Sequence, residues 1–419
     1  MRQLLLFTCI LLSATLFSQT ENASSRFRHP AEWEPMEGIW IGLSDKSFLA
    51  GPSVEQGMAD CIKILQNYVT VNMNVKNDSM LFIQKKLLSK NGIDTNKIRF
   101  IIHDAGVGKR GTIRDTGPGF LINDNKEILA VDFNFEGGGF RPGGTEQSKT
   151  ATEKFDRELA ATINIPVRKA NVISQGGGRD LNGKGTLLLV EQLDMDGNKK
   201  LRKYQIEEEY KKALGVTKII WLNRGLLEDE RLDYGTIWNE LYPVGSGGHI
   251  DLFCRFAGPN TILLAQITEK ERVSNPIAAI NYHRLEENYE ILKNATDQDG
   301  KPFTIIRIPV GPHMTAKHVL TENDKYVLNL APVKKVGDTF HYVLGTSYLN
   351  FIIANGVVIT SKYWKPGRPK EFKVRDNQAV LTLQKAFPAH KIVAIDIEGY
   401  NHDGAGFHCI TLNQPKVNN

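Results

Sequence analysis

The sequence predicts an α/β fold, and three features of the residue pattern support this prediction. Runs rich in β-branched and aromatic residues, bounded by Gly, Asn, Asp or Pro, are typical of strands. Segments between them place apolar residues at three-four spacing, which is typical of helices. Pairs of strand-like runs joined by short turns precede a helical segment and a further strand, unlike the simple βα repeat of a doubly wound sheet.

The expected elements follow one another along the chain without a low-complexity linker after residue 30. Tight hairpins are expected at 181–185 and at Asn355-Gly356, because Asn-Gly between two apolar runs favours a two-residue turn. Irregular insertions are expected at 194–203 and 363–375. The expected strands are 37–43, 70–75, 97–103, 127–135, 186–192, 218–222, 304–310, 343–354 and 392–397. The expected helices are 54–69, 79–88, 152–163, 202–214, 278–292 and 377–387.

The N-terminus has the layout of a secretory signal. Arg2 precedes an apolar run over 4–17, and a polar stretch follows at 19–25. The run is shorter than the ~20 residues that a spanning helix needs, although an uncleaved anchor stays open. We therefore expect residues 1–18 to be a signal peptide, residues 26–419 to form one domain, and the protein to be exported to the periplasm or outside the cell.

Charge and cysteine content restrict the classes of function and partner that we expect for this protein. The net charge is +5 over 419 residues, and the basic run at 199–203 is followed at once by three glutamates, which favours a solvated helix face. We expect no nucleic-acid partner and no membrane contact after signal cleavage. Cys9 would leave with the signal, so Cys61, Cys254 and Cys409 remain. An odd number of cysteines in an exported protein indicates that one thiol is kept free for chemistry.

Polar clusters interrupt the apolar pattern at two places in the first two thirds of the chain. Arg114-Asp115-Thr116-Gly117-Pro118 alone is typical of a surface turn. His249 and Asp251 alternate with Ile250 in a strand-like run after two glycines, so both are expected on the same face. Either a core histidine or a metal site would also fit this pattern. A metal would need further donors, for which the sequence offers His402, Asp403 and His408.

A third and a fourth cluster lie near the C-terminus. Asn350 lies beside the predicted hairpin and carries little information alone. Cys409 follows His408 and a glycine segment, Gly404-Ala405-Gly406, and is expected to enter a strand. Buried cysteines are common core residues, but a thiol together with a histidine is also a nucleophile-base pair. Serine-hydrolase and phosphate-loop signatures do not stand out.

At these residues the chain resembles the agmatine deiminase and bacterial (Porphyromonas-type) peptidylarginine deiminase family. The similarity runs from about residue 29 to 416, and its elements occur in family order. They are the opening His-Pro-Ala-Glu-Trp-Glu-Pro-Met-Glu-Gly at 29–38, Arg-Asp-x-Gly-Pro at 114–118, Gly-His-x-Asp at 248–251, Ser-Tyr-x-Asn-Phe at 347–351, and x-His-Cys-Ile-Thr at 407–411 with Gln414-Pro415.

The resemblance implies a five-bladed α/β propeller of ββαβ modules around a central active site. It implies that Cys409 attacks the guanidinium carbon while Asp115 and Asp251 bind the guanidinium nitrogens. His249 would protonate the departing ammonia and then activate water against the thiouronium intermediate. The products would be a ureido compound and ammonia, and neither a metal nor an organic cofactor would be needed.

The chain departs from the family pattern at two positions. Thr112 stands three residues before Asp115, where the family often has an aromatic residue that packs over the substrate. Gln175-Gly176-Gly177 stands where the family has Glu-Gly-Gly, so an amide replaces the carboxylate that would support the histidine. We expect Gln175 to line the pocket and orient His249, but it cannot stabilise an imidazolium by charge. Asn350 and Arg141 are the other expected substrate-binding residues, although Arg141 could equally be an ordinary surface-loop arginine.

The family contains several activities, and the sequence leaves them open. The motifs favour conversion of agmatine to N-carbamoylputrescine, with deimination of a C-terminal peptidyl-arginine to citrulline as the alternative. An amidinotransferase and a non-catalytic guanidinium-binding protein are alternatives of other classes. The expected partner is a small cationic guanidinium compound or an arginine-containing peptide, and a homodimer is a further expectation.

Overall fold

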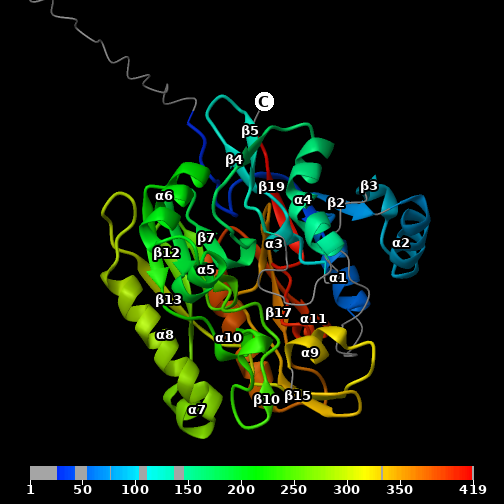
Figure 1. The fold of residues 1–419 in the computed structure, drawn as a ribbon, viewed down its shortest axis with the longest axis vertical. Coiled ribbons are helices and arrows are strands. Elements are labelled where there is room, and N and C mark those ends of the chain that lie inside the picture. Colours follow the sequence, from blue (N-terminus) through cyan, green and yellow to red (C-terminus); the bar gives the residue numbers. More distant parts are fainter. Residues whose placement is uncertain are drawn as a thin grey trace, which may run out of the picture.

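The structure is a computed structural model, and it describes residues 26–42, 54–75, 77–102, 111–135, 146–331 and 334–417. Within these ranges the strands form six separate sheets of three or four strands, with helices between the strands (Figure 1). The α/β class predicted from the sequence is therefore correct.

Five of the six sheets share one pattern of strand pairing. An antiparallel pair is followed by a helical segment, and the next strand returns parallel to the second strand of that pair. A parallel return requires a crossover connection, which the helices supply. This is the hairpin-helix-strand order that the residue pattern predicts.

The first of these modules contains β1 (Met36–Ile41), α1 (Glu55–Leu65), β2 (Thr70–Val75), α2 (Asp78–Lys90) and β3 (Ile98–Ile102). The second contains β4 (Gly119–Ile122), β5 (Ile128–Asp132), α4 (Glu146–Thr162) and β6 (Val167–Lys169). The third contains β7 (Arg179–Leu181), β8 (Thr186–Val190), α5 (Glu191–Gly197), α6 (Lys203–Leu214) and β9 (Lys218–Leu222). The fourth contains β11 (Cys254–Gly258), β12 (Thr261–Gln266), α7 (Glu269–Ser274), α8 (Pro276–Asn294) and β13 (Thr304–Pro309). The fifth contains β16 (Ile352–Ala354), β17 (Val357–Lys362), α10 (Lys370–Ala386) and β18 (Lys391–Asp396).

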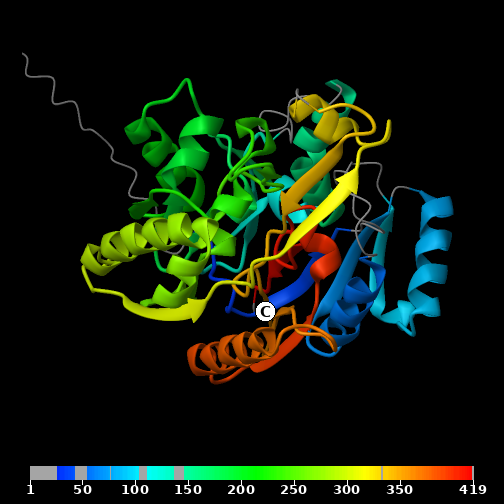
Figure 2. The ribbon, with the colours of Figure 1, turned by 90° about the horizontal axis from the view of Figure 1, so that it is seen from below.

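The two ends of the domain meet in one sheet. The last strand, β19 (Thr411–Pro415), pairs antiparallel with β1 and completes the first module. The Trp40 indole Nε1 donates to the Gln414 Oε1 across this pair at 3.0 Å. In Figure 2 the modules are distributed around the end of β19, which is marked C. The turn that precedes β19 and contains Cys409 is thereby held against elements from distant parts of the sequence.

The sixth sheet is an addition to the repeated pattern. It contains β10 (Leu241–Tyr242), β14 (Thr315–Val319) and β15 (Thr339–Val343), with α9 (Lys325–Leu330) between the last two. The prediction of one strand over 343–354 is wrong, because the backbone leaves β15 at Val343 and enters β16 only at Ile352. The intervening segment is a buried loop, and its apolar residues belong to the core rather than to a strand.

The predicted hairpins are confirmed. Gly356 has φ 83° in the turn between β16 and β17, and Gly183 has φ 71° in the turn between β7 and β8. Both values lie in the left-handed region that glycine enters without steric cost. In the described part of the chain, no helix has the length and apolar character needed to cross a membrane. The predicted signal peptide at 1–18 lies outside the described residues.

Candidate active site

Short segments at the ends of strands carry the polar residues that the sequence singled out. Asp115 lies in α3 (Ile113–Thr116), Gln175 precedes a 3-10 turn over Gly176–Gly178, and Asp251 lies in a 3-10 turn over Ile250–Leu252. Cys409 lies in a turn that ends where β19 begins at Thr411. The strand geometry expected for His249-Ile250-Asp251 and for Cys409 is therefore wrong, although the predicted proximity of His249 and Asp251 is right.

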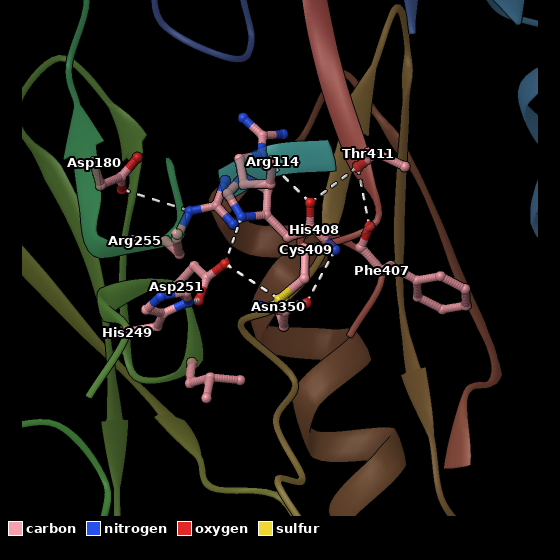
Figure 3. A network of polar contacts seen from close by, with 12 residues as sticks. Arg114, Asp180, His249, Asp251, Arg255, Asn350, Phe407, His408, Cys409 and Thr411 are labelled. Carbon is pink, nitrogen blue, oxygen red and sulfur yellow. Dashed lines mark hydrogen bonds and ion pairs between the residues drawn. The ribbon is translucent and has the colours of Figure 1, made fainter. Parts of the chain in front are cut away.

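Three separate chain segments bring together Cys409, His249, Asp115 and Asp251, called here the catalytic cluster. Figure 3 shows His249, Asp251 and Cys409 close to one another. The Cys409 Sγ is 3.9 Å from the Asp251 Oδ2, and the His249 Nδ1 is 3.9 Å from the Asp251 Oδ1. The His249 Nε2 is 4.0 Å from the Asp115 Oδ1. All four residues are at least 95% buried. The structure therefore brings together every residue that the sequence predicted to be catalytic.

Gln175 orients His249, as predicted. Its Oε1 lies 2.7 Å from the His249 Nε2, and an amide oxygen can only accept, so the Nε2 carries the proton in this contact. A neutral His249 then has its lone pair on Nδ1, which faces Asp251. The buried Nε2 of Gln175 has no hydrogen-bond partner among the described residues. An unsatisfied buried amide favours a polar ligand or water at this point.

Asp115 is held by the segment that also carries Gln175. Its Oδ1 accepts a hydrogen bond from the Gly177 backbone N–H at 3.0 Å. The backbone N–H of Arg114 donates to the carbonyl of Cys409 at 3.1 Å. The surface turn that the sequence alone would favour at 114–118 is instead a buried short helix that fixes the position of the nucleophile.

Asn350 contacts the thiol directly. Its Nδ2 is 3.5 Å from the Cys409 Sγ, and its Oδ1 accepts the backbone N–H of His408 at 3.0 Å. A Cβ at Gly406 would lie 2.1 Å from the Asn350 Oδ1, so a side chain at this position would displace the amide. The glycine segment before Cys409 is thus required for close packing around the nucleophile.

Asp229 was not identified from the sequence, and it organises the loop that leads to His249. Its carboxylate accepts backbone N–H groups of Ser246 at 2.7 Å, Gly248 at 3.0 Å and His249 at 2.5 Å. Gly247 and Gly248 have φ values of 107° and 98°, which place the loop in the left-handed region. Asp229 lies in an acidic run, Glu228-Asp229-Glu230, which resembles an ordinary surface charge cluster, so no sequence signal distinguishes it.

A second group of residues contacts Asp251 through His408. The sequence reasoning did not single out Glu32, and it considered His408 only as a metal donor and as the neighbour of Cys409. Glu32 accepts hydrogen bonds from the Arg114 Nη1 at 2.7 Å and the Arg255 Nη2 at 2.5 Å. His408 lies between this glutamate and Asp251, 2.8 Å from the Glu32 Oε1 and 2.7 Å from the Asp251 Oδ2. The signal for Glu32 and His408 was present, because both lie inside the motifs that carry the family resemblance.

A small cavity lies on the Glu32 side of the site. It has a volume of about 50 Å³, enough for one or two waters, and it is lined by Glu32, Arg114, Arg179 and Asp180 among others. No member of the catalytic cluster lines it. It adjoins the site through Glu32 and through Arg114, whose backbone N–H donates to the Cys409 carbonyl.

The electrostatic setting opposes an ionised thiol in the protein alone. Burial raises the pKa of Cys409 well above its usual value, and the negative charges of Asp251 and Asp115 raise it further. For Asp251, burial also raises the pKa, but the hydrogen bond and charge of His408 outweigh it and leave the pKa below its usual value. The site thus holds an ionised carboxylate beside a protonated thiol, and a cation placed there would favour the thiolate.

Among the described residues, one group could offer three ligand atoms to a metal ion. It consists of His249, Asp251 and Cys409, whose donor atoms lie within 4.8 Å of one another. The extra donors considered from the sequence, His402, Asp403 and His408, are outside this group. The His402 Nδ1 instead contacts the Tyr342 hydroxyl at 2.7 Å. The metal-capable group is thus the catalytic cluster without Asp115. Arg141 lies outside the described residues.

Comparisons with known proteins agree over most of the chain. The sequence matches the Porphyromonas-type peptidyl-arginine deiminase family over residues 28–415. It is 27% identical to an agmatine deiminase of Medicago truncatula, over 93% of this chain and 97% of the relative, and 27% identical to one of Pseudomonas putida, over 95% and 98%.

Solved structures share the fold. The agmatine deiminase of Enterococcus faecalis superposes with a TM-score of 0.72 at 24% identity, over 93% of this chain and 96% of that chain. An agmatine deiminase of C. jejuni has a TM-score of 0.66 at 21% identity, over 93% and 97%. Since the family match spans nearly the whole described region, the chain belongs to the Porphyromonas-type peptidyl-arginine deiminase family.

Proposed function

We propose that the protein is a hydrolase that converts agmatine to N-carbamoylputrescine and ammonia through a covalent Cys409 intermediate. The observation that supports this most directly is the convergence of one thiol, one histidine and two carboxylates in a buried site. A guanidinium has five N–H donors and no acceptor, so ionised carboxylates are its natural partners. The curated relatives, all agmatine deiminases among those compared, support agmatine as the substrate.

In this mechanism the Cys409 sulfur attacks the central guanidinium carbon and its proton passes to His249. The bond from carbon to one terminal nitrogen then breaks, and His249 protonates that nitrogen so that it leaves as ammonia. The remaining thiouronium carbon is attacked by water, whose proton His249 accepts. Cleavage of the carbon–sulfur bond releases the ureido product and regenerates the thiol. The unpartnered Gln175 Nε2 is placed to donate to the incoming oxygen.

The guanidinium substrate supplies the positive charge that would stabilise a Cys409 thiolate. A guanidinium cation between Asp115 and Asp251 offsets the two carboxylates that, after burial, raise the pKa of Cys409. The thiolate therefore forms when the cation is bound, and the free protein keeps the thiol protonated. Such coupling restricts the reactive form of the nucleophile to the complex.

The proposal also includes the architecture of the fold and the cellular location of the protein. Five modules with the same strand pairing support a five-bladed propeller with the catalytic cluster at its centre. The signal-like segment at 1–18 supports export of a mature single domain, in which the protein would meet extracellular guanidinium compounds. N-terminal sequencing of the protein recovered outside the cytoplasm checks this, and an intact Met1 on exported protein would contradict it.

The activity is tested by ammonia release from residues 19–419 with agmatine, free arginine and a peptide ending in arginine, compared side by side. We expect agmatine to be preferred. Cys409→Ala should lower kcat at least about 10³-fold while guanidinium binding persists. Cys254→Ala is the matched control, because Cys254 is equally buried but lies in β11 outside the catalytic cluster.

Two outcomes would change the assignment. Preference for the peptide would establish a peptidyl-arginine deiminase, the activity after which the family is named. Binding without release of ammonia from any of the three compounds would contradict the enzyme assignment and leave a guanidinium-binding protein.

A further inference from the structure

His408 stands between two carboxylates and contacts both. It is 98% buried, its Nδ1 lies 2.7 Å from the Asp251 Oδ2, and its Nε2 lies 2.8 Å from the Glu32 Oε1 (Figure 3 shows His408 beside Cys409). A neutral imidazole has one N–H donor and one acceptor nitrogen, whereas an ionised carboxylate only accepts. Both contacts are hydrogen bonds only when both ring nitrogens carry a proton.

The first of these carboxylates, Glu32, is ionised. Glu32 accepts from two guanidinium groups, those of Arg114 and Arg255, in addition to His408. Burial raises the pKa of Glu32, but the charges of Arg114, His408 and Arg255 outweigh it and hold the pKa well below its usual range. A proton shared in the Glu32–His408 contact therefore resides on the imidazole.

The second carboxylate, Asp251, contacts no lysine or arginine among the described residues. The Oδ2 of Asp251 is occupied by His408, with Cys409 at 3.9 Å, while the buried Oδ1 has no hydrogen-bond partner among the described residues. Arg255 acts on Asp251 through space. The two oxygens of Asp251 thus have separate environments, and the open one faces His249.

The backbone of His408 is fixed independently of its ring. Its N–H donates to the Asn350 Oδ1 at 3.0 Å, and its carbonyl accepts from the Arg114 Nε at 3.3 Å. The remaining charged group that acts on it is Asp180, which pairs with Arg255 at 3.6 Å. The ring orientation is therefore set by the two carboxylates rather than by the chain path.

We propose that His408 is a doubly protonated positioning residue, an imidazolium that bridges Glu32 and Asp251 and directs the free Oδ1 of Asp251 at the guanidinium substrate. Its cation also balances the charge of Asp251, which lowers the cost of forming the neighbouring Cys409 thiolate. His408 does not itself touch the reacting atoms. The proposal rests on the guanidinium chemistry proposed above for its catalytic consequence, but the charge of His408 can be measured without turnover.

The direct test is the protonation of the His408 ring in the whole protein, residues 19–419, labelled with ¹⁵N-histidine. The His408 signals are identified by their loss in His408→Asn. We expect both ring nitrogens to carry protons at about pH 7, because two ionised carboxylates accept from them. An unprotonated ring nitrogen at about pH 7 would overturn the proposal, whether or not the protein turns over agmatine.

Two variants separate positioning from structural support. The amide nitrogen of His408→Asn stands near the position of Nδ1 and keeps a donor toward Asp251, whereas that of His408→Gln stands near Nε2 and keeps a donor toward Glu32. Each variant removes the charge and one contact. We expect kcat/KM for agmatine to fall about 10-fold in His408→Asn and about 10²-fold or more in His408→Gln, because only the second releases Asp251.

Thermal unfolding of both variants measures how much stability each substitution removes. His402→Asn removes another buried imidazole and shows the loss of stability and activity expected from lost packing alone. Equal losses of kcat/KM in His408→Asn and His408→Gln that follow their thermal stabilities would reduce His408 to a structural role. An inactive wild-type protein whose His408 is doubly protonated would contradict the proposed function and leave the charge assignment standing.

Discussion

Gln175 is the residue at which this chain departs most clearly from the pattern of the family it belongs to. Its Oε1 holds the His249 Nε2 at 2.7 Å, so the orienting contact survives the exchange of a carboxylate for an amide. What is lost is a negative charge next to the imidazole. Asp115 and Asp251, at 4.0 and 3.9 Å from the ring nitrogens, remain as the nearby charges that favour protonated His249.

At this scale we predict that Gln175→Glu stabilises the imidazolium form of His249. A carboxylate in contact with the Nε2 should shift the alkaline limb of kcat/KM for agmatine upward by about one pH unit or more, because the protonated histidine serves as the acid for ammonia. The pH profile of both proteins measures this. Gln175→Asn, which shortens the side chain without adding charge, should lower activity and leave the limb in place. An unchanged limb in Gln175→Glu would show that another group controls it.

Short turns, rather than strands, position the catalytic groups. The 3-10 turn over Gly176–Gly178 lies against His249 and Asp251 so closely that a Cβ at Gly177 would stand 2.4 Å from the His249 Nδ1 and 3.0 Å from the Asp251 Oδ2. Asp229 fixes the facing loop through three backbone N–H groups. The two loops thus define the space on either side of the imidazole.

For this element we predict that Gly177→Ala lowers kcat about 10²-fold or more, because the added methyl displaces His249 from its position beside Asp251. Steady-state kinetics with agmatine measures the loss. Gly258→Ala is the matched control, since a Cβ at Gly258 meets only Thr261 at an ordinary 3.6 Å and should leave activity unchanged. Full activity in a folded Gly177→Ala protein would show that the turn tolerates movement of the histidine.

The molecule as a whole buries several acids that have no strong cationic partner. Burial is the largest cause that raises the pKa of Asp156 to about 8, of Asp194 and Asp229 to about 7, and of Asp180 to about 6. Glu32 and Asp251 behave oppositely, because charged partners hold their pKa values below the usual range. These two groups contribute to the pH dependence of folding with opposite signs.

We therefore predict that the protein is more stable near about pH 6 than near about pH 8. The acids with raised pKa values bind protons in the folded protein at pH values where the unfolded chain has released them. The free energy of unfolding therefore falls as pH rises from about 4 until the folded pKa values, about 6 to 8, are passed. Below about pH 4 the stability supplied by ionised Glu32 and Asp251 is lost as they are protonated.

Thermal unfolding across this pH range measures the effect. Asp194→Asn should flatten the decline, because Asp194 then no longer ionises beside Tyr210, whose hydroxyl donates to it. A melting temperature that rises steadily from about pH 6 to about pH 8 would contradict the prediction.

The sequence by itself determined the α/β class and the two hairpins, and it singled out the residues that the proposed function makes catalytic. Local patterns carry this information, since strand and turn preferences act over a few residues, and the family motifs keep Cys409, His249, Asp115 and Asp251 in order along the chain. It also indicated the contact between Gln175 and His249, through the exchange of one residue in a known motif.

Only the tertiary structure decided how these groups are held. His249, Asp251 and Asn350 appeared to lie in strands, because their apolar neighbours alternate or run together, but those neighbours are buried by packing between modules and the backbone there forms turns and loops. Glu32 and His408 are 376 residues apart and meet because β19 closes onto β1. Contacts between segments so distant depend on the closure of the fold, and no local pattern in the sequence encodes them.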